Sequence, residues 1–317
     1  MLSPMLPAIN DVEGAKVPET LPFIIDSHVH IFPDSIFKTI WKWFDEFAWP
    51  IRYKLASPDV LSYLLSRGVG HIIALQYAHK PGIARDLNNY MVKLCQKFPG
   101  NVTGMATVFP GESACEVILK EAFANGLQGV KLHAHVQCFD MNSKDMDEIY
   151  ETCSSAQKPL VMHVGREPKS PAYKCDPYLL CDAEKLERVI KNYPKLKVCV
   201  PHLGADEFLK YKQLIEKYDN LWLDTTMALS DYLPLKNPIR LDEMRSDRIM
   251  YGSDFPNIPY AWDREIKFFE KNRLSDDFIE SVLSKNAVNL FHLKSMKNEN
   301  GCPRISSRES LSEKMLI

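Results

Sequence analysis

Five side chains that can bind a divalent cation lie at the ends of apolar segments in this sequence. Two of them, His28 and His30, belong to the segment FIIDSHVHIF, in which an apolar run is followed by an aspartate and two histidines. Alternate side chains of an extended strand point to the same side, so these two histidines could bind one ion together. The full set comprises His28, His30, His163, His202 and Asp254.

The chemistry of the set is that of a metal centre. Imidazole nitrogens and carboxylate oxygens are ligands of Zn²⁺, and Mn²⁺ and Fe²⁺ also accept them. Taken alone, a histidine at a strand end is more often a structural residue than a ligand, and a pair of histidines one residue apart arises often by chance. The ordered set is a stronger indication than any member, and it predicts a site for a divalent ion.

These five residues would converge only if their segments are parallel strands of one sheet or barrel. Amphipathic helical patterns, such as residues 83–98 and 183–193, fill most gaps between eight short apolar runs. This alternation predicts an α/β fold, a (β/α)₈ TIM barrel whose carboxyl strand ends form one mouth. A doubly wound open sheet is the alternative. The runs are residues 23–26, 71–77, 102–109, 127–133, 159–164, 197–202, 221–225 and 248–254.

Some segments depart from the simple repeat. Residues 31–57, after the first strand, form an aromatic-rich insertion that is too long for an ordinary strand–helix loop. It could be a lid, a dimer contact or a packed insert. Extra C-terminal helices over residues 275–293 are expected to pack on the outside of the barrel. We therefore predict an N-terminal arm (1–20), a barrel (21–293) and a flexible polar tail (294–317).

Composition narrows the class of protein. The 317 residues carry a net charge of −2 without a basic stripe, which argues against nucleic-acid or membrane partners. The 8 cysteines form no CxxC pair and are expected to be free thiols of a reducing compartment. No apolar run reaches the ~18 residues of a membrane span, and the N-terminus does not resemble a secretory signal. We expect a cytoplasmic protein.

Several motifs together resemble a known family. DSHVH, VKLH, MHVG, PHLGA, DTT and YGSDFP are similar to motifs of the amidohydrolase superfamily, in particular its amidohydrolase-related branch of TIM-barrel metal-dependent hydrolases. KNAVNLFHL resembles the closing helix of that branch, and the resemblance covers roughly residues 22–293. The branch includes lactonases, other hydrolases and nonoxidative decarboxylases. The resemblance is specific for the fold and the metal site and poorly specific for the substrate.

The resemblance implies a role for each residue of the set. His28 and His30 match the ligands of the first strand, and His163 matches the ligand of the fifth. Asp254 matches the carboxylate of the last strand, which binds the metal or transfers a proton. His202 matches the histidine that contacts the substrate or the reacting water. A single ion is usual in the branch, so we expect one Zn²⁺, with Mn²⁺ as an option.

Lys131 is the most ambiguous residue. In members of the superfamily with two metal ions, a lysine on the fourth strand is carbamylated and bridges them. Alternatively, Lys131 is an ammonium that binds an anionic substrate group, or it faces the helices. His133 has the same strand parity as Lys131, so both could bind substrate, whereas His135 lies further out in the loop.

Two further positions concern ligand binding and orientation. Arg166 follows His163 by three residues and could hold a substrate carboxylate in bidentate fashion, or it could form a salt bridge within its loop. Asp224 and Thr225 end the seventh run and could orient a metal ligand.

Three functions remain open at this point. The first is a metal-dependent hydrolase that uses metal-activated water on a small ester, lactone or amide, with Asp254 accepting the water's proton. The second is a metal-dependent decarboxylase of an aromatic or unsaturated carboxylic acid, in which Asp254 or His202 protonates the carbanion. The third is a noncatalytic binding protein. The expected partners are a small-molecule substrate, possibly carboxylate-bearing, and a second copy in a homodimer.

Overall fold

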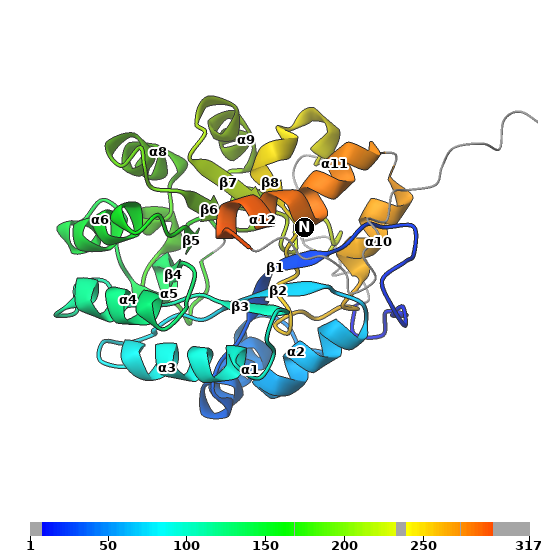
Figure 1. Ribbon diagram of the computed structural model, residues 1–317, viewed down its shortest axis with the longest axis horizontal. Coiled ribbons are helices and arrows are strands. Elements are labelled where there is room, and N and C mark those ends of the chain that lie inside the picture. Colours follow the sequence, from blue (N-terminus) through cyan, green and yellow to red (C-terminus); the bar gives the residue numbers. More distant parts are fainter. Residues whose placement is uncertain (1–7, 168, 233–238, 273, 294–317) are drawn as a thin grey trace, which may run out of the picture.

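Parallel strands form the centre of the molecule, and helices surround them (Figure 1). The computed structural model describes residues 8–167, 169–232, 239–272 and 274–293. All eight predicted strands occur within these residues. They are β1 (Ile25–His30), β2 (His71–Leu75), β3 (Val102–Gly104), β4 (Val130–His133), β5 (Leu160–His163), β6 (Val198–Val200), β7 (Leu221–Asp224) and β8 (Ile249–Met250).

Hydrogen bonds close the strands into a barrel. β1, β2 and β3 pair in order, and β4 to β8 pair in order. Ala106, just after β3, forms a parallel bridge with Val130 and joins the two sets. The amide of Ser27 in β1 donates to the carbonyl of Tyr251, next to β8, at 2.9 Å. The first and last strands are therefore neighbours, which confirms the (β/α)₈ barrel and excludes the open sheet.

Amphipathic helices cover the outside of the barrel. In α8, for example, Leu186, Val189 and Ile190 recur at helical spacing and are buried. Asp182 caps α8 by accepting a hydrogen bond from the amide of Glu184 at 2.7 Å. The outer helices are α2 (Ser57–Ser66), α3 (Ala84–Cys95), α4 (Cys115–Ala124), α6 (Asp147–Ser155), α8 (Ala183–Asn192), α9 (Phe208–Lys217) and α10 (Arg264–Lys271). None of the helices in the described residues is both long and apolar enough to cross a lipid bilayer.

The C-terminal helices are placed differently from the expectation. The chain runs through α11 (Asp276–Glu280) and a π-helical turn, η5 (Ser281–Lys285), into α12 (Asn286–Phe291), which lies over the ring of strands in Figure 1. Leu290 and Phe291 pack against inward-facing strand residues such as Ile25 and Val161. The expectation that these helices lie outside the barrel is therefore wrong for α12. Its apolar face covers side chains that would otherwise face water.

The aromatic-rich insertion folds as a helix and an extended return. α1 (Asp34–Phe47) follows β1, and Trp49 beyond it donates from Nε1 to the carbonyl of Asn257 at 2.9 Å. The ring of Trp43 stacks on Tyr173 with centroids 5.4 Å apart. α1 therefore lies against the loop that follows β5, on the side where the carboxyl strand ends meet.

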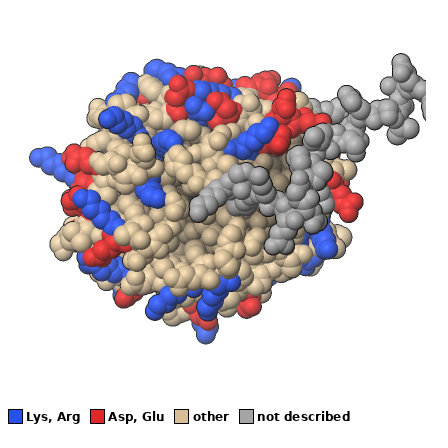
Figure 2. All heavy atoms as spheres, in the orientation of Figure 1, with Lys and Arg blue, Asp and Glu red and all other residues tan. Residues whose placement is uncertain are grey.

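The remaining N-terminal residues pack on the barrel without helix or strand. Glu13 forms ion pairs with Arg52 and Arg67, both at 3.1 Å, and accepts hydrogen bonds from Tyr53 and Tyr63. Residues 1–7 of the predicted arm and the predicted tail 294–317 lie outside the described residues. Around the rim in Figure 2, basic and acidic side chains are mixed rather than separated, as the small net charge leads one to expect.

Candidate active site

β1 and the turn after β8 bring three of the predicted ligands together. His28, His30 and Asp254, which we call the first histidine cluster, offer ligand atoms that all lie within 4.8 Å of one another. His30 Nε2 is 3.0 Å from Asp254 Oδ1, and His28 Nε2 is 3.5 Å from it. Both histidines lie inside β1 rather than after it, and the pairing with β2 shifts register between Asp26 and Val29. Because the two residues are two positions apart on one strand, both rings reach the same carboxylate oxygen of Asp254.

A buried carboxylate orients His28. Asp224, the last residue of β7, accepts a hydrogen bond from His28 Nδ1 at 2.9 Å, and both side chains are fully buried. The bond fixes the proton on Nδ1 and leaves the lone pair of Nε2 for an ion. Burial, together with the neighbouring Lys131, holds the pKa of His28 well below its usual range, so the ring is a neutral ligand. Asp224 thus has the orienting contact that its strand-end position suggested.

A second buried carboxylate braces the turn that carries Asp254. Asp26 accepts hydrogen bonds from the hydroxyl of Ser253 at 2.5 Å and from its amide at 3.1 Å. Asp254 itself has a left-handed backbone, with φ of 66°, which is uncommon for a residue other than glycine. Burial raises the pKa of Asp254, but His30 and His28 outweigh this and hold it well below the usual range. The turn therefore presents an ionised carboxylate to the two histidines.

Gly252 packs against His28 so closely that a side chain at position 252 would collide with it. A Cβ at this position would lie 2.5 Å from Thr226 Oγ1 and 2.7 Å from the Cβ of His28. Gly252→Ala is expected to weaken ion binding at least about tenfold and to destabilise the fold by about 1–3 kcal/mol, because the packed neighbours must move. Metal titration and thermal unfolding measure the two effects. Gly82→Ala is the control: it strains a backbone with φ of 82° in open space, and should leave ion binding unchanged.

Lys131 points into the barrel, so the possibility that it faces the helices is excluded. It is fully buried, and its Nζ lies 3.4 Å from His28 Nε2. Burial lowers the pKa of its ammonium to about 8, while Asp224 and Asp254 limit the shift. A lysine with this pKa is about one tenth deprotonated at pH 7 and half deprotonated at about pH 8, and its ammonium can compete with a cation for the space beside His28.

The pH dependence of metal binding tests this competition. Below a pH of about 8, the Lys131 ammonium repels an ion at His28 Nε2, and above it the neutral amine does not. The ion's affinity should rise by up to about tenfold per pH unit below about pH 8 and then level off, since binding displaces one proton. Lys131→Met should flatten this part of the curve in a metal titration. Equal slopes in the two proteins would show that Lys131 does not compete with the ion.

His163 lies in a different group from the first histidine cluster. His133, His135 and His163, which we call the second histidine cluster, also offer ligand atoms within 4.8 Å of one another. The rings of His133 and His163 stack with centroids 4.1 Å apart, and His135 stands edge-on to both. Sequence reasoning placed His135 out in the loop and gave it no role. The short helix α5 (Ala134–Gln137) begins at once after β4 and keeps it at the barrel mouth.

His202 lies between the two clusters. Its ring centroid is 6.0 Å from that of His28 and 4.7 Å from that of His163. Its Nδ1 donates to the carbonyl of Thr226 at 2.9 Å, which leaves Nε2 free to accept or carry a proton. The residue has φ of 56° and opens a short 3₁₀ turn, η2 (His202–Gly204).

Arg166 is held within its own loop. Its Nε donates to the carbonyl of Cys181 at 2.8 Å, and its Nη2 pairs with Asp182 at 2.7 Å. Glu207 lies 3.7 Å from the other terminal nitrogen. Two roles were open for Arg166, and these contacts correspond to the salt bridge within its loop. The partner, Asp182, directly precedes α8.

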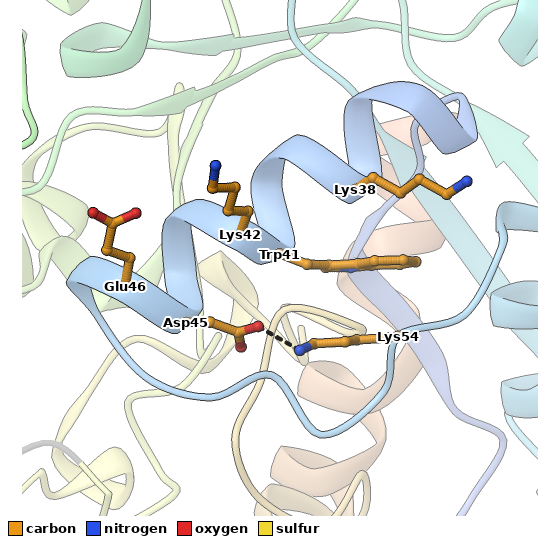
Figure 3. Close-up of a pocket in the computed structure, with 6 residues that line it drawn as sticks. All are labelled: Lys38, Trp41, Lys42, Asp45, Glu46 and Lys54. Carbon is orange, nitrogen blue, oxygen red and sulfur yellow. Dashed lines mark hydrogen bonds and ion pairs between the residues drawn. The ribbon is translucent and has the colours of Figure 1, made fainter.

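The surface of α1 carries a shallow hollow, away from the two histidine clusters. Figure 3 shows its lining, with Trp41 between lysines and an ion pair between Asp45 and Lys54. It contains no histidine and consists mainly of exposed charged side chains. The chemistry therefore belongs to the buried clusters. The hollow is lined by Lys38, Trp41, Lys42, Asp45, Glu46 and Lys54.

Comparison with known proteins gives a consistent assignment. The sequence model of the family described as Amidohydrolase matches residues 25–293. The fold is similar to 5-carboxyvanillate decarboxylase from Novosphingobium aromaticivorans, solved with manganese and 4-hydroxy-3-methoxy-5-nitrobenzoic acid, with 17% identity, a TM-score of 0.62 and coverage of 89% of this chain and 99% of that chain.

Two further structures show the same likeness. One is an uncharacterized TIM-barrel protein from Bordetella bronchiseptica, with 17% identity, a TM-score of 0.65 and coverage of 85% of this chain and 98% of that one. The other is described as a 2-pyrone-4,6-dicarboxylic acid hydrolase from Pseudomonas putida, with 19% identity, a TM-score of 0.59 and coverage of 86% and 99%. No curated protein is similar to this chain in sequence. At these identities the structures establish the fold alone.

Proposed function

Because the chain belongs to the amidohydrolase family, we propose that this enzyme is a metal-dependent hydrolase whose first histidine cluster holds one divalent ion. The observation that carries the proposal is the position of the Asp254 carboxylate, whose Oδ1 lies 3.0 Å from His30 Nε2 and 3.5 Å from His28 Nε2. Hydrolysis needs a proton acceptor beside the ion, and an ionised carboxylate is one. Decarboxylation needs a proton donor at the same place.

The donor atoms of the first histidine cluster fit a divalent ion. His28 Nε2 is left as a lone pair by the bond from Nδ1 to Asp224, and His30 Nε2 and a carboxylate oxygen lie beside it. Two imidazoles and a carboxylate suit Zn²⁺ or Mn²⁺, and we propose zinc first. A divalent ion bound there would lower the pKa of a water molecule toward about 7 and polarise a substrate carbonyl.

The chain's own residues would then have distinct tasks. Asp254 would accept the proton of the attacking water and return it to the leaving group. His202, with Nδ1 fixed on the carbonyl of Thr226, would offer Nε2 to the substrate oxygen on the side of the second cluster. Lys131 and His133 would face the substrate, since both side chains are buried within the barrel.

We propose a small ester, lactone or amide that also carries a carboxylate. Lys131 is the buried cation that could attract an anionic group. The similar structures are named for carboxylic acids of this kind, a carboxyvanillate and a pyrone dicarboxylate. Free thiols at the seven cysteines of the described residues suit a cytoplasmic enzyme, and the exposed Phe47 on α1 could contribute to a homodimer.

A nonoxidative decarboxylase is the second candidate, and His202 is the observation that favours it. Its free Nε2 lies between the clusters and could deliver a proton to a carbanion. In that reaction the carbon–carbon bond of the carboxylate breaks, carbon dioxide leaves, and the proton takes its place. The ion would hold the substrate's carboxylate or phenolate.

Product analysis in isotopic water separates these functions. The zinc- or manganese-loaded enzyme is incubated with a panel of lactones and aromatic carboxylic acids in H₂¹⁸O. Hydrolysis places ¹⁸O in the acid product and releases no carbon dioxide, as we expect. Release of carbon dioxide without incorporation of ¹⁸O would replace the proposal by the decarboxylase. Tight binding without turnover would point to the noncatalytic binding protein.

A further inference from the structure

We propose that Glu265, on α10, is a positioning residue that sets the tautomer of His202 through a single peptide group. This group joins Thr226 to Met227 in the turn that follows β7. Glu265 does not touch His202, and no motif in the sequence singles it out. The inference deepens the proposed function, in which His202 is a reacting residue, and rests on that function only for the expected effect on turnover.

The peptide group lies between two hydrogen-bonding partners. The amide nitrogen of Met227 donates to Glu265 Oε1 at 2.6 Å. The carbonyl of Thr226 accepts from His202 Nδ1 at 2.9 Å. The N–H and C=O bonds of a trans peptide point in opposite directions, so Glu265 and His202 lie on opposite sides of one rigid plane. Hydrogen bonds in such a chain strengthen one another, because each bond polarises the next.

The contact with Thr226 decides which nitrogen of His202 carries the proton. A carbonyl oxygen can only accept a hydrogen bond, so Nδ1 must be the protonated nitrogen of the neutral ring. Nε2 is then left with a lone pair. The tautomer matters in either proposed reaction, because it decides whether Nε2 of the neutral ring accepts or donates.

The peptide group is held in an orientation that needs support. Met227 has φ of 59°, which is uncommon for a residue other than glycine and persists only where the surroundings favour it. A flip of the peptide plane would return Met227 to the usual negative range of φ. The flip would also turn the carbonyl of Thr226 away from His202 and present the amide of Met227 in its place. Nδ1 would then have to accept, and the proton of His202 would move to Nε2. The bond to Glu265 opposes this flip.

Glu265 is a buried carboxyl group that serves the backbone of this turn. Its side chain is 2% exposed, and Oε2 has no hydrogen-bond partner within the described part of the chain. Burial raises the pKa of Glu265 well above its usual range, although the amides of Met227 and Leu229 oppose the shift. An apolar side chain would avoid the cost of burying a carboxyl group, but it would leave the amide of Met227 without an acceptor.

The backbone of His202 is fixed separately from its ring. Its amide donates to Asp224 Oδ1 at 3.3 Å, and its carbonyl accepts from the amide of Ala205 at 2.9 Å. Neither contact involves Glu265 or the peptide group that it binds. Loss of Glu265 is therefore expected to change the tautomer of the ring without removing His202 from the barrel mouth.

Nuclear magnetic resonance of the histidine rings tests the proposal on the full chain without substrate. Metal is removed first, so that the tautomer reports the chain's own contacts. Long-range ¹H–¹⁵N correlations distinguish the two neutral tautomers at about pH 8.5, where a histidine of ordinary pKa is neutral. His202→Gln identifies the signal of His202. We expect the Nδ1–H tautomer in the wild type and in Glu265→Gln, whose amide oxygen still accepts from Met227.

Glu265→Met should shift the tautomer ratio of His202 toward Nε2–H by at least about tenfold, because the acceptor for the amide of Met227 is gone. Glu270→Met removes an exposed glutamate of the same helix and should leave the ratio unchanged. If thermal unfolding shows that Glu265→Met is not folded, Glu265→Asp replaces it, since the shorter side chain withdraws the oxygen from the amide. An unchanged ratio in the folded variant, or the same shift in Glu265→Gln, would overturn the proposal.

A double-mutant cycle on turnover shows whether Glu265 acts through His202. His202→Gln should lower kcat about 10²-fold, and Glu265→Met about tenfold. In the His202→Gln background, Glu265→Met should cost less than about twofold, because the residue through which it acts is already missing. Equal losses in both backgrounds would overturn the proposal. A shifted tautomer with unchanged kcat would uphold the link between the two residues and overturn the proposed role of His202 instead.

Discussion

Asp254→Asn is expected to lower kcat about 10³-fold at saturating metal, because the amide keeps the shape of the side chain but cannot accept a proton. The wild-type carboxylate lies 3.0 Å from His30 and is ionised. Its loss should also weaken the ion, but less, since an amide oxygen is still a ligand. Turnover of the identified substrate and zinc affinity are measured on the same preparation.

A matched substitution separates this effect from a change in charge. Asp242→Asn removes an exposed carboxylate paired with Arg240, far along the chain from the histidines, and should leave kcat unchanged. If Asp254→Asn kept wild-type turnover at saturating metal, Asp254 would not be the proton acceptor, and His202 would be the next residue to test. A loss of turnover that excess metal restores would identify Asp254 as a ligand only.

The first histidine cluster could be predicted because its residues lie within a strand or just after one. A period of two places His28 and His30 on one side of β1, and the last strand delivers Asp254 next to it once the barrel closes. The sequence left the direction of Lys131 open, and the structure shows that it lies inside β4 with its side chain buried in the barrel. Strand parity and barrel closure were therefore enough to predict that His28, His30 and Asp254 lie close together.

The grouping of the other histidines could not be predicted in the same way. His163 was expected to bind an ion together with His28. Its ring lies against those of His133, His135 and His202, because β4 and β6 flank β5 in the sheet. His135 reaches the site only because a four-residue helix follows β4 directly. Such a short helix has too few residues to show a period, so the sequence carries no signal for it.

The contacts of Arg166 and the packing position of the last helix could not be predicted from the sequence either. Arg166 binds Asp182, a partner 16 residues away along an irregular loop, and no spacing rule relates two such positions. α12 was predicted as a helix from its apolar period, which shows that one face is buried but not against which surface. The inward-facing apolar residues at one end of the barrel supply that surface.

His28→Ala should remove the ion from the first histidine cluster and lower turnover at least about 10³-fold, because ion and base act together. It should also destabilise the fold by about 1–3 kcal/mol, since the buried carboxylate of Asp224 would lose the hydrogen bond from His28 Nδ1. The loss of stability alone could explain lost activity. A second variant is therefore needed to separate the two effects.

The double variant His28→Ala/Asp224→Asn separates them. Replacing the carboxylate by a neutral amide removes a buried charge that has lost this hydrogen bond, so much of the lost stability should return in thermal unfolding. Zinc binding at the first cluster and turnover should not return, because Nε2 of His28 is still missing. If turnover recovered together with stability, the role of His28 would be structural, and the metal centre would have to be sought among His133, His135 and His163.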